Sequence, residues 1–144
     1  WQVPDDIKAQ NGNAEQLGSI AEVAAQADFL SLHMPGGADT YKMINADVFN
    51  ALKPGAFLVN SARGDVVDED ALFDALDSGQ LSAAGLDVFH NEPALDPRFM
   101  NYGNIVLAPH LGSATDGTRV GMGYRAIENL KAFLSGDTPG DLVS

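Results

Sequence analysis

The feature that most constrains the fold is a regular alternation of short apolar runs with helical segments. The apolar runs span residues 29–33, 56–60, 84–89 and 105–108. They are four to six residues long, which is the usual length of a strand. Their nearly continuous apolar character is typical of parallel sheets, whose strands are covered on both faces. The alternation therefore predicts a Rossmann-like α/β fold with part of a doubly wound parallel sheet.

Capping residues indicate where the intervening helices begin. The expected caps and helices are Ser19 before 20–27, Asn45 before 46–52, Asp68 before 69–78, and Thr115 or Ser113 before a long final helix to about Leu134. Gly79 and Gly136 follow the last two of these helices and are expected to end them. The tail 137–144 is expected to fray.

Composition excludes several classes of function. The chain has 8 basic and 20 acidic residues, a net charge of -12, so nucleic acid is not an expected partner. It has no cysteine, which excludes disulfides, thiolate zinc sites and cysteine nucleophiles, and we expect no metal. No apolar run approaches the roughly 18 residues of a membrane span, and no secretory signal is recognised. The expected compartment is the cytoplasm, with no membrane partner.

Three charged side chains follow the ends of three predicted strands. Arg63, Glu92 and His110 should lie at one edge, because parallel strands end on the same side. Arginine binds a carboxylate through two parallel hydrogen bonds, and histidine transfers protons near neutral pH. A glutamate beside the histidine would orient its ring and favour the charged form. The alternative interpretations are a surface ion pair for Arg63 and simple solvation for Glu92.

Such a trio could bind a 2-oxo acid and protonate its carbonyl oxygen while a hydride reaches the carbon. No side chain supplies a hydride, so a nicotinamide cofactor would be required. The other histidines are interpreted as structural: His33 as a satisfied histidine at a strand end, and His90 as an exposed loop residue.

The segments that carry the trio resemble the D-isomer-specific 2-hydroxy acid dehydrogenases. The three segments are 60–68 (NSARGDVVD), 85–93 (GLDVFHNEP) and 109–115 (PHLGSAT). Within the family, the pattern is most similar to glyoxylate/hydroxypyruvate reductases, glycerate dehydrogenases and phosphoglycerate dehydrogenases. The resemblance implies that Arg63 binds the substrate carboxylate, that His110 is the general acid/base and that Glu92 pairs with it. It also implies NAD or NADP as cofactor, a small 2-oxo or 2-hydroxy acid as substrate, and a homodimer.

The resemblance also places the cofactor contacts on loops after the strands. The implied cofactor-binding residues are Met34, Pro35, Thr40, Ser61, Ala62, Arg63, Asp87, His110 and Gly112. The loop 35–40 is a looser match than the others, because the family more often has a bulkier residue after the proline.

The family's glycine-rich fingerprint and substrate domain are not found in this sequence. Residues 121–126 (GMGYRA) fit Gly-x-Gly-x-x-Ala as text, but they follow a helical pattern rather than a strand. We therefore expect residues 1–136 to be part of a dinucleotide-binding domain and the chain alone to be a fragment of low activity. Half a sheet should also expose an edge and an apolar face.

The alternative function is an NAD-sensing, corepressor-like binding module of the same fold. A hydrolase is disfavoured because Ser61 and Ser113 do not lie in Gly-x-Ser-x-Gly turns. Formate oxidation in the same superfamily is disfavoured because it usually places glutamine at the position of Glu92.

Overall fold

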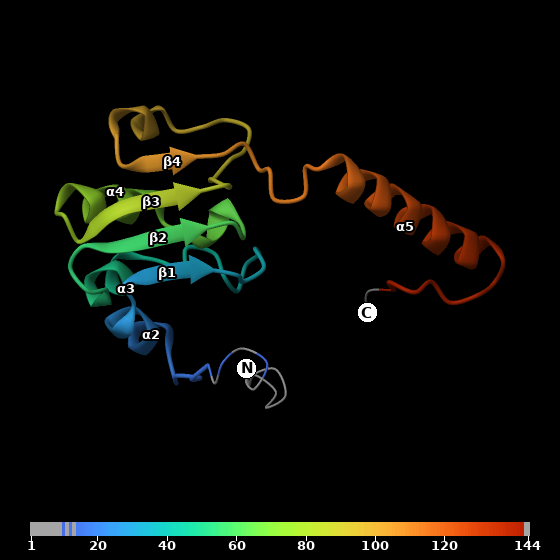
Figure 1. Ribbon diagram of the computed structural model, residues 1–144, viewed down its shortest axis with the longest axis horizontal. Coiled ribbons are helices and arrows are strands. Elements are labelled where there is room, and N and C mark those ends of the chain that lie inside the picture. The colour runs from blue at the N-terminus through green and yellow to red at the C-terminus, as the bar shows by residue number, and fades with distance from the viewer. Residues whose placement is uncertain (1–9, 11, 13, 143–144) are drawn as a thin grey trace. The chain divides into compact units, whose positions relative to one another are not determined.

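The structure is a computed structural model that describes residues 10, 12 and 14–142. It divides into two compact units, the first ending at Ala108 and the second beginning at Pro109. Among the described residues, the first unit holds a sheet with helices α2, α3 and α4, and the second holds the long helix α5 (Figure 1). No helix in the described part of the chain is long and apolar enough to cross a membrane.

The sheet of the first unit has four parallel strands in sequential order. Its strands are β1 (Phe29–Leu32), β2 (Ala56–Asn60), β3 (Leu81–Leu86) and β4 (Ile105–Leu107), in the order β1-β2-β3-β4. The helices are α2 (Ile20–Gln26), α3 (Ala46–Ala51), α4 (Glu69–Asp77) and α5 (Asp116–Leu134), with 3₁₀ turns η1 (Gly64–Val66) and η2 (Pro97–Asn101). The predicted α/β class with a parallel sheet and a long final helix is confirmed.

Side-chain caps begin α2, α3 and α5 where the sequence predicts them. The Ser19 hydroxyl accepts a hydrogen bond from the Glu22 amide, and Asn45 Oδ1 accepts from two amides of α3. Thr115 caps α5 by accepting from the Thr118 amide at 3.2 Å. Each cap satisfies amides that a helix start leaves without a partner.

One local prediction is confirmed only in position, and another is wrong. Asp68 is the N-cap residue of α4, as predicted, but its side chain makes no capping bond, because its carboxylate binds the Lys42 ammonium at 3.1 Å instead. The third strand spans Leu81–Leu86 rather than 84–89. It begins early because Leu81 pairs with Ala56 across an irregular register, a partner that local periodicity does not reveal.

Helices α3 and α4 cover one face of the sheet, and α2 packs against α3. In Figure 1 the strands face the viewer, and α3 and α4 lie behind them. Leu32, Asn60, Leu86 and Leu107 lie in register along the covered face. All but Leu107 are buried against α3 and α4, with Phe49 and Leu72 in the centre of the core.

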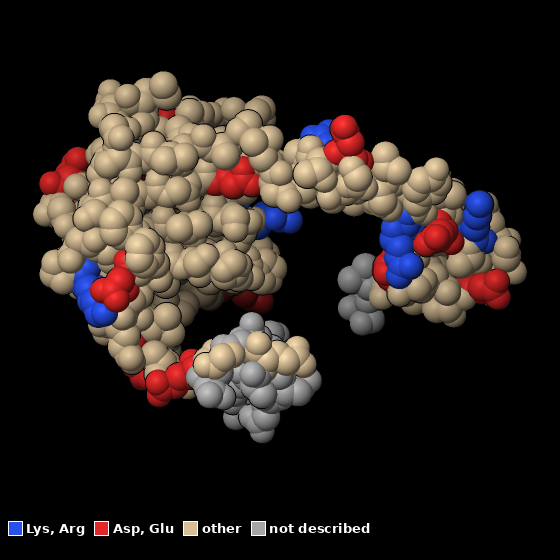
Figure 2. All heavy atoms as spheres, in the orientation of Figure 1, with Lys and Arg blue, Asp and Glu red and all other residues tan. Residues whose placement is uncertain are grey.

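The opposite face of the sheet is apolar and exposed within the first unit. Phe29 stacks on Phe57 with ring centroids 4.9 Å apart, and the two are 69% and 38% exposed. Val59 and Val106 extend this surface, which carries few charged side chains (Figure 2). An uncovered apolar face is what half of a doubly wound sheet should present, because parallel sheets are normally covered on both sides.

The second unit is α5 with a tail that returns along it. The Arg125 guanidinium binds the Asp141 carboxylate at 2.6 and 2.8 Å, and the Asn129 amide donates to the same carboxylate at 2.6 Å. The fraying predicted for 137–144 stays a prediction. Residues 121–126 lie inside α5, so Gly-x-Gly-x-x-Ala has helical context rather than a strand before it.

Replacing Asp141 with asparagine should release this tail. The Arg125 guanidinium and the Asn129 amide lower the pKa of the Asp141 carboxyl below its ordinary value of 3.8. Because that pKa is lower when the tail is bound, the contact stabilises the tail above pH 3.8 and is lost as the pH falls through the lowered pKa. We expect the side-chain amide signals of Asn129 in NMR spectra of the wild type to move at acid pH toward their positions in D141N. A signal that is insensitive to both changes would contradict the contact.

Candidate active site

Asn60 fixes the turn that carries Arg63. It is the last residue of β2, it is 1% exposed, and its side-chain amide donates to the Arg63 carbonyl at 2.9 Å. Its Oδ1 accepts from the Ala62 amide at 3.0 Å. A buried amide whose donor and acceptor are both used ties the turn to the end of the strand. The exposed Arg63 side chain is thereby presented at the carboxyl edge of the sheet.

Gly64 lets the loops after β2 and β3 touch. A Cβ built on Gly64 would lie 2.0 Å from the carbonyl carbon of Phe89 and 2.6 Å from the His90 nitrogen. The Asp87 amide also donates to the Asn60 carbonyl at 2.9 Å. The main chain of one loop thus rests directly on the main chain of the other, which only glycine permits.

Glu92 lies in the second of these loops. Its Oε1 accepts from the Phe89 amide at 3.0 Å, which closes a turn over residues 89–92. Asn91 in this turn has a φ of 60°, in the left-handed region that few residues other than glycine adopt. The structure therefore brings the loops of Arg63 and Glu92 into contact at one edge of the first unit.

The loop after β1 contacts the turn that carries Arg63. The Thr40 hydroxyl donates to the Pro35 carbonyl at 2.7 Å, and the Gly37 amide donates to Asp65 Oδ2 at 3.2 Å. A Cβ on Gly36 would lie 2.7 Å from Asp65 Oδ1 and 3.1 Å from Arg63 Cγ. The predicted cofactor contacts Met34, Pro35, Thr40, Ser61, Ala62 and Asp87 thus belong to three loops that are held together at this edge.

His110 and Gly112 belong to the second unit, immediately after its first residue, Pro109. His110 has a φ of 55°, an unusual conformation for a residue with a side chain. Such outliers are concentrated at functional sites. The approach of His110 to Arg63 and Glu92 remains a prediction, as do the roles assigned to all three. Among the described residues, no group of three or more histidine, aspartate and glutamate side chains could hold a metal ion.

The predictions for the two other histidines have different outcomes. His33 Nε2 lies 2.9 Å from the Ser31 hydroxyl, which confirms its interpretation as a satisfied histidine at a strand end. The interpretation of His90 as an exposed loop residue is wrong, because it is half-buried. Its ring lies edge-on to that of Tyr41, with centroids 6.2 Å apart, and its amide donates to Glu69 at 2.8 Å.

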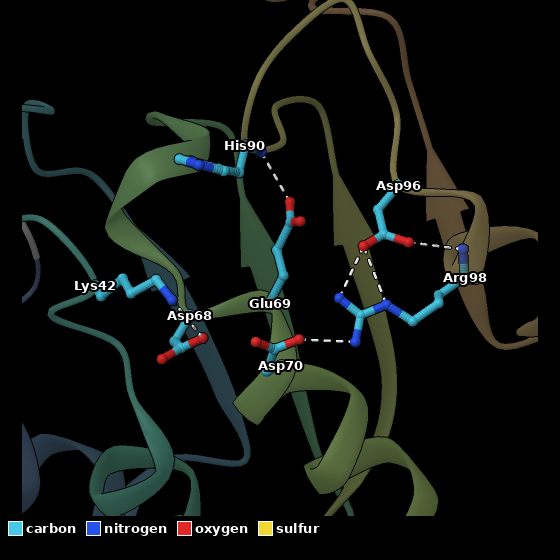
Figure 3. A network of polar contacts seen from close by, with 7 residues as sticks. All are labelled: Lys42, Asp68, Glu69, Asp70, His90, Asp96 and Arg98. Carbon is cyan, nitrogen blue, oxygen red and sulfur yellow. Dashed lines mark hydrogen bonds and ion pairs between the residues drawn. The ribbon is translucent and has the colours of Figure 1, made fainter.

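Sequence reasoning missed a charged network beside these loops. Figure 3 shows three contacts made by consecutive residues at the start of α4. Asp68 binds the Lys42 ammonium, Glu69 accepts a hydrogen bond from the His90 amide, and Asp70 binds the Arg98 guanidinium. Burial raises the pKa of the Glu69 carboxyl above its ordinary value of 4.5, although the His90 amide and ring act in the opposite direction. Three consecutive acidic residues at a helix start are visible in the sequence, but their partners lie 21 to 28 positions away.

Comparison with known proteins identifies the family. Residues 2–112 match the NAD-binding domain of the D-isomer-specific 2-hydroxyacid dehydrogenases. The chain belongs to this family. The predicted resemblance is thereby confirmed.

Relatives within the family include reductases of small 2-oxo acids. The chain is 45% identical, over 83% of its length, to a glyoxylate reductase from Thermococcus litoralis. It is 43% identical over 81% of its length, with a TM-score of 0.79, to an NADPH-dependent glyoxylate/hydroxypyruvate reductase from Sinorhizobium meliloti, whose structure contains NADP and malonate. It is 32% identical over its whole length, with a TM-score of 0.91, to D-mandelate dehydrogenase from Rhodotorula graminis. The chain spans 36%, 37% and 43% of these three proteins, respectively.

The residues at the carboxyl edge fit the nicotinamide cofactor that the family implies. Gly37 has a φ of 130° and no described atom within 4 Å of the position of a Cβ, so a ligand can approach its main chain. Met34 is a half-buried apolar side chain, and Arg63 is an exposed cation. Apolar contacts with a few polar groups are typical of cofactor sites.

Substituting Gly64 with alanine should destabilise the first unit. The added methyl group would overlap the main chain of Phe89, which cannot rotate away, so we expect a loss of about 3 kcal/mol or more in the free energy of unfolding. Urea denaturation measures this loss. The matched control is G85A in β3, where no described atom lies within 4 Å of the added methyl group and where we expect a change below about 1 kcal/mol. Equal stability of both variants would contradict the crossing of the two loops.

Proposed function

We propose that the full-length protein containing this chain is an NAD(P)-dependent D-2-hydroxyacid dehydrogenase that reduces a small 2-oxo acid of the glyoxylate or hydroxypyruvate type. The observation that carries the proposal is the contact between the Arg63 and Glu92 loops across Gly64. This contact supports the proposal because Arg63, the cation proposed for the substrate carboxylate, and Glu92, the carboxylate proposed for the histidine, belong to adjoining loops. Membership of the family and the 45% identity to a glyoxylate reductase support the same conclusion.

Arg63 is the proposed substrate-binding residue. A guanidinium offers two parallel N–H donors that match a carboxylate, and its charge also favours negative charge developing on the adjacent carbonyl oxygen. The Asn60 side-chain amide donates to the main-chain carbonyl of Arg63. The direction of the Arg63 side chain is therefore set by a turn that this hydrogen bond fixes. The malonate in the Sinorhizobium meliloti structure shows that this relative accommodates a small carboxylic acid.

His110 is the proposed proton donor during reduction, and Glu92 is its proposed partner. A carboxylate beside an imidazole favours the protonated ring and fixes its orientation. The protonated ring gives its proton to the carbonyl oxygen of the 2-oxo acid, and the neutral ring accepts the proton from the hydroxyl group in the reverse direction. The left-handed main chain of His110 is consistent with a constrained functional residue.

A nicotinamide cofactor, when bound, would supply the hydride that these residues cannot supply. Met34, Pro35, Thr40, Ser61, Ala62, Asp87 and Gly112 are the proposed cofactor contacts beside Arg63 and His110. NAD or NADP as cofactor and the homodimer remain predictions from the resemblance, and the cytoplasmic location remains a prediction from the sequence composition.

Replacing Arg63 with alanine in the full-length gene product should lower kcat/KM for glyoxylate and hydroxypyruvate. We expect a loss of roughly 1.5–3 kcal/mol, or about 10- to 160-fold, because a charge-assisted pair with the substrate carboxylate disappears. R63K should recover only part of this loss, because lysine keeps the charge but not the paired donors. Steady-state oxidation of NADH and NADPH measures both variants.

The control for Arg63 is K53A, which removes one positive charge from the opposite end of the strands. Lys53 binds Asp28 at 2.9 Å, ahead of β1 and β2. We expect K53A to leave kcat/KM within about twofold of the wild type, because surface ion pairs contribute little. If R63A were as active as K53A, Arg63 would not belong to the site. If the wild type bound the dinucleotide but turned over neither acid, the binding-module alternative would replace the enzyme.

Glu92→Gln should move the pH profile of 2-oxo acid reduction toward acid. Removing the negative charge makes the protonated imidazole less favoured, so the required proton is lost at a lower pH. The measurement is kcat/KM against pH in the full-length gene product. A profile that does not move would show that Glu92 and His110 are not coupled.

A further inference from the structure

The start of α4 presents three consecutive carboxylates, and each binds a different segment of the chain. We call Asp68, Glu69 and Asp70 the acidic turn. Asp68 binds the Lys42 ammonium at 3.1 Å, Glu69 accepts from the His90 amide at 2.8 Å, and Asp70 binds the Arg98 guanidinium at 2.7 Å (Figure 3). The acidic turn therefore connects the segment after the β1 loop with both ends of the segment 89–98 that contains Glu92.

The first end of this segment is held on two sides. Glu92 Oε1 accepts from the Phe89 amide at 3.0 Å, and Glu69 accepts from the next amide, that of His90. The direction of the Glu92 side chain thus depends on a turn of four residues whose main chain is anchored to α4. A hydrogen bond from an amide to a carboxylate is stronger than one to a neutral acceptor, which suits an anchor of this kind.

The second end is held through Arg98. The Asp96 carboxylate accepts from Arg98 Nε and Nη2 at 3.0 and 2.8 Å, while Nη1 contacts Asp70. The guanidinium carbon also lies 4.5 Å from the centre of the Phe73 ring in α4. The orientation of Arg98 is therefore fixed by two carboxylates and an aromatic face.

Glu69 lies where the burial of a charged carboxylate reduces the stability of the fold. It is half-buried, and burial raises the pKa of its carboxyl group. A group whose pKa is raised in the fold contributes stability at low pH and loses that contribution as the pH rises through the raised pKa. Glutamine at this position would keep an acceptor for the His90 amide without that loss.

We propose that the acidic turn positions Glu92 for its action on His110, with Glu69 and Asp70 as positioning residues that hold the two ends of segment 89–98. This inference rests on the proposed dehydrogenase function, but the anchoring contact itself does not require turnover. The acidic turn also lines a cavity of about 310 Å³ together with Tyr41, His90 and Arg98.

The first experiment measures the anchor without activity. Hydrogen exchange of peptides covering 86–94 is compared by mass spectrometry in the wild-type full-length gene product and in the variants E69A, E69Q and D47N. We expect E69A to accelerate exchange roughly tenfold, because the His90 amide loses its acceptor. E69Q should stay within about threefold of the wild type, because an acceptor oxygen remains. Asp47 is an exposed carboxylate in the first turn of α3, so D47N is the matched control and should change nothing.

The second experiment measures positioning through Glu92. E69A should lower kcat for glyoxylate roughly tenfold and should shift the pH profile in the same direction as E92Q, while E69Q should recover most of kcat. In the E92Q background, E69A should cause less than a twofold further loss, because both substitutions remove the same contribution. D70N should give a smaller effect of the same sign. It tests the proposal if E69A does not fold, because Asp70 is 70% exposed and we expect its replacement to leave the fold intact.

The outcomes separate the two proposals. The positioning role would be overturned if the losses of kcat in E69A and E92Q were fully additive in the double variant. It would also be overturned by an unchanged pH profile in both E69A and D70N. Unchanged exchange at 86–94 in E69A would overturn it whether or not the protein turns over. Accelerated exchange in a wild-type protein that reduces no 2-oxo acid would retain the anchor and reject the proposed function.

Discussion

The candidate site depends on the contact between Gly64 and the main chain of Phe89. Adjacent parallel strands lie about 4.8 Å apart, so loops that leave neighbouring strands on the same side compete for the same space. The absence of a side chain at Gly64 lets the loop after β2 rest on the loop after β3. The buried amide of Asn60 then closes the turn before Gly64. Without the close contact at Gly64, the loops that carry Arg63 and Glu92 would not be fixed relative to each other.

The loops at this edge are held mostly by polar contacts to the main chain. Asn60, Glu69 and Glu92 each bind one or more main-chain amides or carbonyls of a loop that contains a candidate site residue. Apolar packing, in contrast, is concentrated among the sheet and helices α2, α3 and α4. This division lets the hydrophobic core supply stability while directional hydrogen bonds set the positions of charged side chains. The half-buried Glu69 shows that such positioning has an energetic cost.

Local signals predicted most of the fold. Ser19, Asn45 and Thr115 cap their helices because a short polar side chain at a helix start satisfies amides a few residues away. Asp68 has the same local signal but binds Lys42, 26 positions earlier, so a distant partner outcompetes the cap. The early start of β3 at Leu81 likewise depends on pairing with Ala56 in another strand.

The candidate site was predicted only in part for the same reason. The strand ends indicated the loops of Arg63 and Glu92, because all parallel strands finish on one side. The sequence did not reveal that Gly64 allows the two loops to touch, because a glycine in a loop does not indicate which other segment packs against it. His90 was taken for a solvated residue because its contacts with Tyr41 and Glu69 come from other elements.

The most direct test of the central claim is a crystal structure of the full-length gene product with NADPH and oxalate, a small acid that cannot be reduced. We predict that the Arg63 guanidinium binds a carboxylate of oxalate through two hydrogen bonds. We also predict that a ring nitrogen of His110 contacts an oxygen of the ligand and that Glu92 contacts the other ring nitrogen. An oxalate bound elsewhere, or one bound at this edge without Arg63 and His110, would contradict the account.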